Sequence, residues 1–488
     1  MKLSGGAFLG AITLDPRAGE PLHRQLYEAL RRAIVSRQLR SGTRLPSTRS
    51  LAADLGVSRN TVLAAFEQLT CEGYLAARPG VGTRVAATIP DELLAVHRRP
   101  ALMPRARPPR RAEATPAVAI NSGRIRAFEP ALPALDLFPV KLWARLVARQ
   151  WSGSSVTSAL AYGDPAGHQR LREAVAQYVG AARGVVCDAE QVVITNGTLH
   201  ALELSARVLV DPGDAVWFEE PGYPYARLML SAAGARVIAV PVDREGLSIE
   251  AGLARAPSPR LIYVTPSHQF PLGVTMSAAR RMQLLEVARR AEAWIFEDDY
   301  DCECRHAGLP LPAIRSLDTT GRVLYAGSFS KALFPSLRLG YLVLPPALVE
   351  PYLRSRALSG RASRGVDQAV VAEFILGGHL DRHLRRMRVA YRERQEALLA
   401  AAARHLAGLV RIERGDAGLH AIGWLAGIDD AAASRAAAEQ NIEAPPLSAF
   451  CAEDRLPGAL VLGYGAVTPR QIFTAAERLA RALEPLAR

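Results

Sequence analysis

The first part of the chain repeats apolar residues with the period of a helix. An amphipathic helix is predicted over residues 21–37 by apolar residues on one face, namely Leu22, Leu26, Leu30 and Ile34. A second, shorter helix begins near Ser47, and a third can be capped by Ser58. Because a tight turn at Gly56-Val57 separates these two helices, the pattern predicts a helix-turn-helix.

Two short strands are predicted after the third helix, at residues 74–78 and 84–86, with a glycine-rich turn at residues 80–83. Three helices and a hairpin form a winged helix-turn-helix, whose third helix enters the major groove of DNA. The first turn of this helix, which faces away from the predicted core, contains Arg59, Asn60 and Thr61. We therefore expect the first part of the chain to bind double-stranded DNA.

The pattern changes from about residue 120, where short β-branched strands alternate with helices rich in Ala, Leu and Arg. The clearest strands are predicted at Val192–Thr195, Ala215–Glu219, Leu261–Thr265, Ala293–Glu297, Val323–Ala326 and Tyr341–Leu344. This alternation is typical of an α/β domain built on a mostly parallel, doubly wound sheet.

The stretch between these two patterns mixes six prolines with six arginines over residues 87–118. Such a composition favours extended, solvated backbone over packed structure. We therefore predict three parts: a DNA-binding domain at residues 15–86, a basic linker at residues 87–118 and an α/β domain at residues 119–488.

Composition narrows the class of protein further. No run of about 18 apolar residues is free of charge, and the N-terminus lacks the pattern of a secretory signal, so we expect a cytoplasmic protein. The five cysteines are irregularly spaced and predict neither disulfides nor a metal site. The net charge of +13 and the pI of about 9.9 agree with a polyanionic partner, although a coding bias toward arginine has the same effect.

Lysine is rare, since only three of the 60 basic residues are lysines, namely Lys2, Lys141 and Lys331. A lysine amine can form an imine with an aldehyde, whereas the guanidinium group of arginine cannot. Lys331 follows a predicted strand, is preceded by Ser328 and Ser330, and is followed by Arg338. These residues suit an aldehyde cofactor with a phosphate group, which the hydroxyls and the guanidinium would hold.

Further features upstream fit the same kind of cofactor. Asp298 follows the apolar strand Ala293–Phe296, where a carboxylate can pair with a protonated ring nitrogen. Gly197 and Thr198 join a strand to a helix, whose free backbone amides can bind phosphate. Tyr223 offers an aromatic ring that can stack on the cofactor.

A specific string of residues runs through the first domain: Leu45-Pro46-Ser47-x-Arg49, Leu51-Ala52, Ser58-Arg59-x-Thr61-Val62, Leu69, Glu72-Gly73-Tyr74-Leu75 and Gly80-x-Gly82-Thr83. The string closely resembles the GntR-type winged-helix family. The resemblance implies that DNA is contacted by Arg49, Ser58, Arg59, Asn60 and Thr61, and by the wing at Gly82 and Thr83. Ser58 can cap its helix at the same time.

The large domain carries motifs in a fixed order: Tyr162-Gly163-Asp164-Pro165-x-Gly167, Gly197-Thr198, Pro221-Gly222-Tyr223, His268-Gln269-x-Pro271-x-Gly273, Asp298 and Tyr300, Lys331, and Arg338. They resemble the class I aminotransferases, which are fold-type I enzymes that use pyridoxal 5'-phosphate (PLP). The resemblance implies that Lys331 holds PLP as the internal aldimine, with Asp298 on the pyridine nitrogen and Tyr300 on the ring hydroxyl. It also implies cofactor contacts for Tyr223, Gly197, Thr198, Gln269, Ser328, Ser330 and Arg338, and for Tyr162 toward the cofactor of the partner subunit.

A GntR-type head joined by a basic linker to an aminotransferase-like domain resembles the MocR/GabR family of bacterial transcriptional regulators. The resemblance implies a cytoplasmic, head-to-tail homodimer that binds a DNA operator and responds to a small-molecule effector.

One position departs from the pattern of the aminotransferases and of the γ-aminobutyrate-sensing regulators. Those proteins clamp a carboxylate with an arginine near the C-terminus, whereas here Val461 stands at that place and no arginine lies between Arg455 and Arg470. A lost charge-assisted contact costs about 1.5–3 kcal/mol, which is roughly tenfold or more in binding. We therefore do not expect efficient transamination.

Three hypotheses follow from the sequence. The first is a DNA-binding regulator that senses an effector through PLP on Lys331, the effector being an amine, an amino acid or PLP itself. The second is an active aminotransferase with a DNA-binding appendage. The third is a repressor whose large domain is only a dimerisation scaffold.

Overall fold

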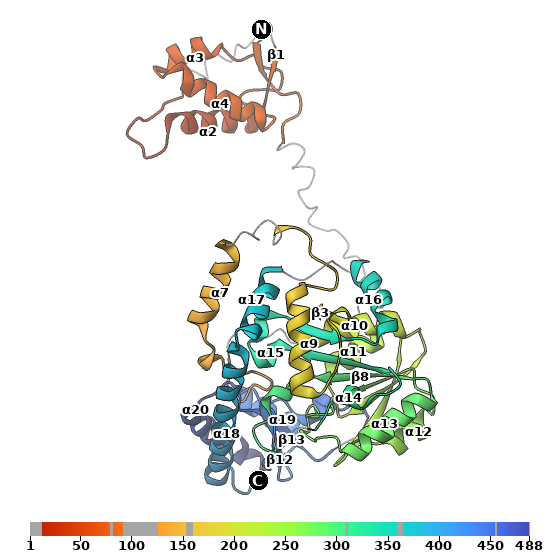
Figure 1. Cartoon of the computed structure of the whole chain (residues 1–488). Coiled ribbons are helices and arrows are strands. Elements are labelled where there is room, and N and C mark those ends of the chain that lie inside the picture. The colour runs from red at the N-terminus through yellow and green to blue at the C-terminus, as the bar shows by residue number, and fades with distance from the viewer. Residues whose placement is uncertain are drawn as a thin grey trace. The chain divides into compact units, whose positions relative to one another are not determined.

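The computed structural model describes residues 12–78, 82–90, 125–152, 160–308, 311–358, 365–453 and 456–487. Contacts divide the chain into two compact units, residues 1–116 and 117–488 (Figure 1). Of the predicted linker, only residues 87–90 belong to the described residues. None of the described helices is both long enough and apolar enough to cross a membrane.

The first unit is a winged helix-turn-helix, as predicted. Its elements are α2 (Leu22–Val35), α3 (Thr48–Leu55), α4 (Arg59–Cys71), β1 (Leu75–Arg78) and β2 (Gly82–Val85). The hydroxyl oxygens of Ser47 and Ser58 accept the backbone N–H groups of Ser50 and Thr61 at 3.1 Å, so both predicted caps are present. The core is formed by side chains from all three helices, including Leu26, Leu30, Leu51, Val62 and Phe66.

The wing differs from the prediction. Gly82 and Thr83 were expected in the turn, but they belong to β2, where they pair with Arg78 and Ala77 of β1. The hairpin extends this far because Leu45 donates its N–H to the carbonyl of Thr83 at 2.9 Å, which adds a partner on the other edge of β2.

The second unit begins with helices and then follows the strand–helix alternation of an α/β fold. Its helices of five or more residues are α7 (Val140–Ser152), α9 (Gln169–Arg183), α10 (Thr198–Leu209), α11 (Pro224–Ala232), α12 (Ile249–Arg255), α13 (Ala278–Arg290), α16 (Pro346–Leu358), α17 (Gly365–Leu376), α18 (His379–His405), α19 (Asp430–Glu439) and α20 (Pro469–Leu483). The strands of its large sheet are β3 (Val192–Thr195), β4 (Ala215–Glu220), β5 (Arg236–Asp243), β6 (Gly246–Leu247), β7 (Leu261–Val264), β8 (Trp294–Asp299), β9 (Val323–Ser328) and β10 (Gly340–Val343).

The sheet has the order β3-β10-β9-β8-β7-β4-β5-β6. The strands β5, β4, β7, β8 and β9 run parallel, whereas β10 is antiparallel to both β3 and β9, and β6 is antiparallel to β5. The prediction of a mostly parallel sheet is thus confirmed. The short chain between β9 and β10 has no room for the crossover that a parallel pair requires, which explains the exception.

Helices cover both faces of the sheet. Successive residues of a strand point to opposite faces, so neighbouring residues of β3 pack against different helices. Val192 and Ile194 pack in a cluster with residues of α9, α17 and α18, while Val193 packs in another cluster with residues of α10, α11 and α16. Near the C-terminus a second, antiparallel sheet is formed by β11 (Val410–Ile412), β12 (His420–Leu425) and β13 (Ala459–Gly463). It packs with α18, α19 and α20 in a separate core.

Candidate functional site

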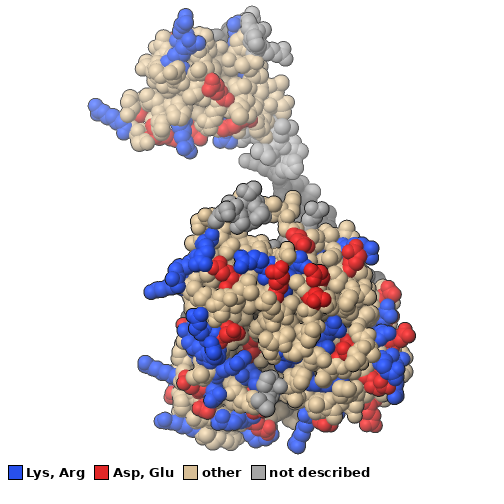
Figure 2. All heavy atoms as spheres, viewed as in Figure 1, with Lys and Arg blue, Asp and Glu red and all other residues tan. Residues whose placement is uncertain are grey.

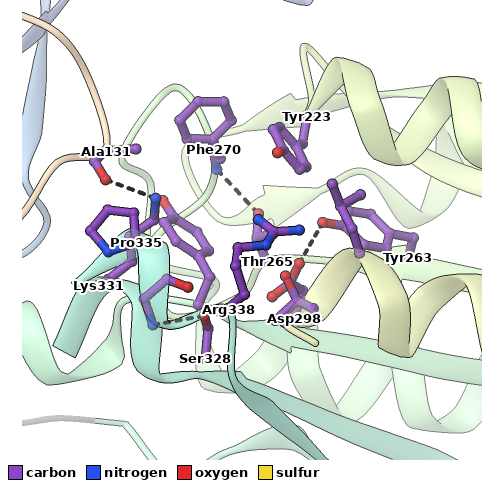
Figure 3. Close-up of a pocket in the computed structure, with 15 residues that line it drawn as sticks. Ala131, Tyr223, Tyr263, Thr265, Phe270, Asp298, Ser328, Lys331, Pro335 and Arg338 are labelled. Carbon is purple, nitrogen blue, oxygen red and sulfur yellow. Dashed lines mark hydrogen bonds between the residues drawn. The ribbon is translucent and has the colours of Figure 1, made fainter. Parts of the chain in front are cut away.

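A cavity of about 160 Å³ lies where the C-terminal ends of β8 and β9 meet the N-terminus of α10. In open parallel sheets, ligands bind at the carboxyl ends of the strands. The lining residues come from distant parts of the chain: Ala131, Gly197, Thr198, Leu199, Tyr223, Tyr263, Thr265, Phe270, Asp298, Tyr300, Ser328, Ser330, Lys331, Pro335 and Arg338 (Figure 3). Nine of the predicted site residues are brought together here.

Lys331 enters the cavity from the short helix α15 (Phe329–Ala332), which follows β9 directly. Its Nζ donates a hydrogen bond to the carbonyl oxygen of Ala131 at 2.7 Å (Figure 3). Burial lowers the pKa of the Lys331 ammonium, while the nearby carboxylates of Asp301 and Asp298 oppose this shift. A lysine with a lowered pKa is more often neutral, and only the neutral amine is a nucleophile.

Asp298 lies within β8, not beyond its end as predicted, because the parallel pairing with β9 continues to Asp299. Its Oδ2 accepts a hydrogen bond from the hydroxyl of Tyr263 at 2.8 Å. Its Oδ1 is buried and has no hydrogen-bond partner among the described residues. Burial raises the pKa of Asp298 to about 7. A buried carboxylate oxygen without a partner is costly, so this group is suited to a donor supplied by a ligand.

Another part of the cavity lining suits an anion. Gly197, with φ +98°, directly precedes the 12-residue helix α10. The first backbone amides of a helix have no partner within the helix, so they can bind an anion. Arg338 adopts a left-handed conformation with φ +49° and also lines the cavity. Ser328 has a second task here, since its Oγ accepts the N–H of Ser330 at 3.1 Å and caps α15.

The predicted contact of Gln269 with a cofactor does not fit its position. Gln269 is buried beside the cavity but does not line it, and its Nε2 donates to the carbonyl oxygens of Pro221 and Phe270, each at 2.8 Å. Its Oε1 accepts the N–H of Leu272 at 3.0 Å, so the amide holds its own loop together. The residue of this loop that reaches the cavity is Phe270.

Tyr162 and Val461 lie outside the lining of the cavity. Tyr162 is 88% exposed, so it is available to another chain but does not contact the cavity of its own. Val461 is fully buried in β13, opposite Ile422 of β12. Its side chain belongs to an apolar cluster that packs on Tyr223, Phe270 and Tyr300, three residues of the cavity wall.

Several lining residues were not foreseen as site residues. Tyr263 belongs to the predicted strand Leu261–Thr265, and only the pairing of β7 with β8 places it beside Asp298. Thr265 is held by buried Glu219, whose Oε2 accepts the Thr265 hydroxyl at 2.5 Å, and the Thr265 Oγ1 accepts the N–H of Phe270 at 3.1 Å. Burial raises the pKa of Glu219 to about 7. The sequence predicted the strand Leu261–Thr265 but carried no signal that Tyr263 or Thr265 of this strand lines a cavity.

His268 connects the cavity wall to the C-terminal sheet. Its Nδ1 lies 2.8 Å from Asp301 Oδ2 and 3.1 Å from the hydroxyl of Tyr300, which donates to the carbonyl oxygen of His268. The chain at Gly418 crosses the ring so closely that a Cβ there would lie 2.0 Å from His268 Cε1. The hydroxyl of Tyr464 fixes this crossing by donating to the carbonyl oxygen of Gly418 at 2.9 Å.

Replacing Gly418 with alanine should therefore destabilise the large unit. Gly427→Ala is the matched control, because both glycines have positive φ (+90° and +75°) but only Gly418 has a neighbour within 4 Å of the added methyl group. We expect the free energy of unfolding to fall by about 1–3 kcal/mol more for Gly418→Ala than for Gly427→Ala. All five tryptophans lie in the large unit, so tryptophan fluorescence during urea unfolding reports it alone. Equal losses would show that His268 is not held by this contact.

The winged helix-turn-helix presents its predicted DNA contacts to solvent. Arg49, Ser58, Arg59 and Asn60 are exposed and Thr61 is half-buried, whereas Val62 and Phe66 of the same helix are buried. Arg44 is a further candidate that the sequence did not single out. The backbone of Arg44 forms an antiparallel β-bridge with that of Arg84 in β2. A Cβ on Gly82 would lie 3.3 Å from the Nε of Arg44, so the Arg44 guanidinium lies next to the wing.

On the face of the large unit drawn in Figure 2, positive charge does not form one continuous patch. On the face drawn in Figure 2, blue Lys and Arg side chains alternate with red Asp and Glu side chains over this unit. The net charge alone therefore does not locate the DNA-binding surface, and the exposed first turn of α4 is the more specific indication.

Comparisons with known proteins agree with both units. The model of the family "Aminotransferase class I and II" matches residues 139–479, and that of "Bacterial regulatory proteins, gntR family" matches residues 22–85. The chain is 44% identical to the probable rhizopine catabolism regulatory protein MocR of Rhizobium meliloti, over 94% of this chain and 93% of that protein. The chain belongs to the MocR-type transcriptional regulators.

Other MocR-type and aminotransferase relatives support the same assignment. The pyridoxine biosynthesis transcriptional regulator PdxR of Corynebacterium glutamicum is 32% identical, over 79% of each chain. Among solved structures, the α-aminoadipate aminotransferase LysN of Thermus thermophilus superposes with a TM-score of 0.71 at 30% identity, over 78% of this chain and 97% of that one. That structure contains N-(5'-phosphopyridoxyl)-L-leucine. This MocR-type regulator thus combines a GntR-type DNA-binding head with the fold of class I and II aminotransferases.

Proposed function

We propose that this MocR-type regulator binds PLP through Lys331 and that an effector reacting at this position changes the affinity of the winged helix for its operator. One observation carries the proposal: the Lys331 amine, the unpartnered Oδ1 of Asp298 and the N-terminus of α10 line a single cavity. They match the aldehyde, the ring nitrogen and the phosphate of PLP, respectively.

The residues of the cavity have distinct tasks in this proposal. The Asp298 carboxylate accepts a hydrogen bond from the protonated ring nitrogen, and the hydroxyl of Tyr263 orients this carboxylate by donating a hydrogen bond to it. The amides of Gly197 and Thr198, the hydroxyls of Ser328 and Ser330, and the Arg338 guanidinium hold the phosphate. Tyr223 and Tyr300 also line the cavity, where Tyr223 would stack on the ring and Tyr300 would contact the ring hydroxyl. When bound, PLP supplies an aldehyde that a primary amine can attack.

Assembly and location are part of the same proposal. A head-to-tail homodimer would bring the exposed Tyr162 of each protomer to the cofactor of its partner and would pair two winged helices for a two-fold operator. A regulator that binds chromosomal DNA would work in the bacterial cytoplasm.

Efficient transamination is not part of the proposal. Val461, in a buried apolar cluster beside the cavity, stands where the aminotransferase pattern has the arginine for the substrate carboxylate. Without that arginine, an amino acid loses a contact of about 1.5–3 kcal/mol. Aminotransferase activity, assayed with a panel of amino donors and keto acids, should therefore stay far below that of an enzyme.

Borohydride trapping tests the proposal on the protein itself. PLP-loaded protein is reduced and digested, and its peptides are analysed by mass spectrometry. Because the chain has only three lysines, Lys2 and Lys141 serve as internal controls for nonspecific reaction. We expect a pyridoxyl adduct on Lys331 and on neither control. Absence of an adduct on Lys331 would refute binding of PLP through Lys331 and favour a bare dimerisation scaffold.

A further inference from the structure

We propose that the effector of this site is a primary amine that carries no carboxylate. The inference rests on the proposed function, and it concerns which amines the cavity admits once PLP is bound to Lys331. It follows from the charges that line the cavity and from the apolar cluster behind its wall.

The charged groups of the cavity are already matched to PLP. Among the described lining residues, three are charged: Asp298, Lys331 and Arg338. In the proposed function Lys331 holds the aldehyde carbon and Arg338 the phosphate, so neither cation is left for a carboxylate of the effector. In the same proposal Asp298 accepts a hydrogen bond from the ring nitrogen of PLP, so it offers a carboxylate of the effector no attraction.

The wall beside Lys331 is aromatic and aliphatic. Tyr223, Phe270 and Tyr300 line the cavity, and behind them lie the buried side chains of Phe450 and Val461. The backbone N–H of Val461 in β13 is also engaged there, since it donates to the carbonyl oxygen of Pro445 at 2.9 Å. A carboxylate placed against this wall would lose its water without gaining a cation or a donor from β13.

Further carboxylates stand close behind the wall. Asp301 lies 2.8 Å from His268, which contacts Tyr300, and Glu219 is hydrogen-bonded to Thr265 of the lining. Each of these acidic side chains is buried. Neither side chain supplies a cation to a carboxylate of the effector, whereas an uncharged substituent on the amine needs none.

The chemical step needs only the amine. The neutral nitrogen of the effector forms a bond to the aldehyde carbon, the bond from that carbon to Lys331 Nζ breaks, and two protons pass from the incoming nitrogen to Nζ. Nothing is oxidised or reduced. The released Lys331 amine can return to its hydrogen bond with the carbonyl oxygen of Ala131.

Pairs of amines that differ by one carboxylate test this inference. We would titrate PLP-loaded, gel-filtered protein with isoamylamine and leucine, phenethylamine and phenylalanine, cadaverine and lysine, and butylamine and 4-aminobutyrate. The change in the absorbance of bound PLP gives a half-saturating concentration for each compound. Free PLP titrated with the same pairs corrects for intrinsic differences in reactivity.

After this correction, we expect the amine of at least one pair to half-saturate at a concentration ten times lower than its amino acid, and no pair to show the reverse. An amino acid that binds as tightly as its amine would overturn the inference, and so would a lack of response to every amine. Failure of the protein to take up PLP at all would instead refute the proposed function, so the two failures are distinguishable.

The variant Val461→Arg supplies a reciprocal test, because it places a cation in the wall. It should bring the amino acids to concentrations at least tenfold closer to those of their amines. Val186→Arg adds the same charge at a site that is 90% exposed, and it should leave the preference unchanged. Because Val461 is fully buried, the variant is interpreted only if it still takes up PLP; the titrations of the unaltered protein decide the inference without it.

Discussion

Replacing Lys331 with alanine should abolish the absorbance of the imine between PLP and the protein and make operator binding insensitive to the effector. The effect should be complete, because a methyl group cannot form the imine and no other lysine lines the cavity among the described residues. The unliganded protein should still bind its operator, because Lys331 belongs to the large unit and not to the winged helix.

The measurement has two parts and one matched control. Absorbance of the PLP-treated protein reports the imine, and the mobility shift of a promoter fragment, selected by the protein from genomic DNA, reports operator binding. Lys141→Ala removes an exposed lysine of the same unit and should behave as the unaltered protein. If Lys331→Ala responded to the effector normally, the covalent link would not be the sensor.

Replacing Arg59 with alanine should weaken specific operator binding by about 1–3 kcal/mol, which is roughly 5- to 150-fold, if its guanidinium reads a base. Arg59 is the first residue of α4, it is exposed, and it follows the cap Ser58, so it lies at the end of the helix that enters the groove. The loss should be smaller on nonspecific DNA, because phosphate contacts supply most of the nonspecific affinity.

Arg24→Ala is the control for charge. Arg24 is also exposed, but it lies on α2 and pairs with Glu20 at 3.2 Å. Both variants remove one positive charge from the head, and titrations at several salt concentrations separate this general effect from base recognition. Equal losses for the two variants on operator DNA would contradict the assignment of α4 as the recognition helix.

Local sequence signals predicted much of the fold. The period of the apolar residues located α2, Ser47 and Ser58 marked the starts of α3 and α4, and β-branched runs located most strands of the large sheet. These signals are reliable because they depend on neighbours within one or two turns of chain. The place of β10 between β3 and β9 depends on pairing between distant segments, and the wing at Gly82 depends on its contact with Leu45, so neither could be read locally.

The candidate site also contains residues that the sequence predicted and residues that it did not. Lys331, Asp298, Tyr300 and Tyr223 were predicted because their chemistry is distinctive and the order of their motifs is specific, and all four line the cavity. The resemblance to the aminotransferases implied a cofactor contact for Gln269 and carried no signal for Phe270. In the fold, however, the amide is used to hold its own loop, so the choice between adjacent residues depended on loop geometry. The carbonyl oxygen of Ala131, a backbone group, carries no sequence signal at all.

Sensing in this account requires that the state of the cavity changes the state of the protein. His268 offers one physical route, since it contacts Tyr300 of the cavity on one side and the chain at Gly418 on the other. His420 adds a second connection, because its Nε2 lies 2.9 Å from the carbonyl oxygen of Pro271, next to Phe270. Burial lowers the pKa of His420 to about 3, so this contact keeps the same protonation at any physiological pH.

The most direct test of the account compares operator binding before and after the bond at Lys331 is locked. Full-length, PLP-loaded protein is divided, one half is reduced with borohydride, and the operator affinity of each half is measured with and without a responding amine. The account predicts that the amine changes the affinity of the unreduced half and has no effect on the reduced half, in which exchange at Lys331 is blocked. The same response in both halves would contradict it.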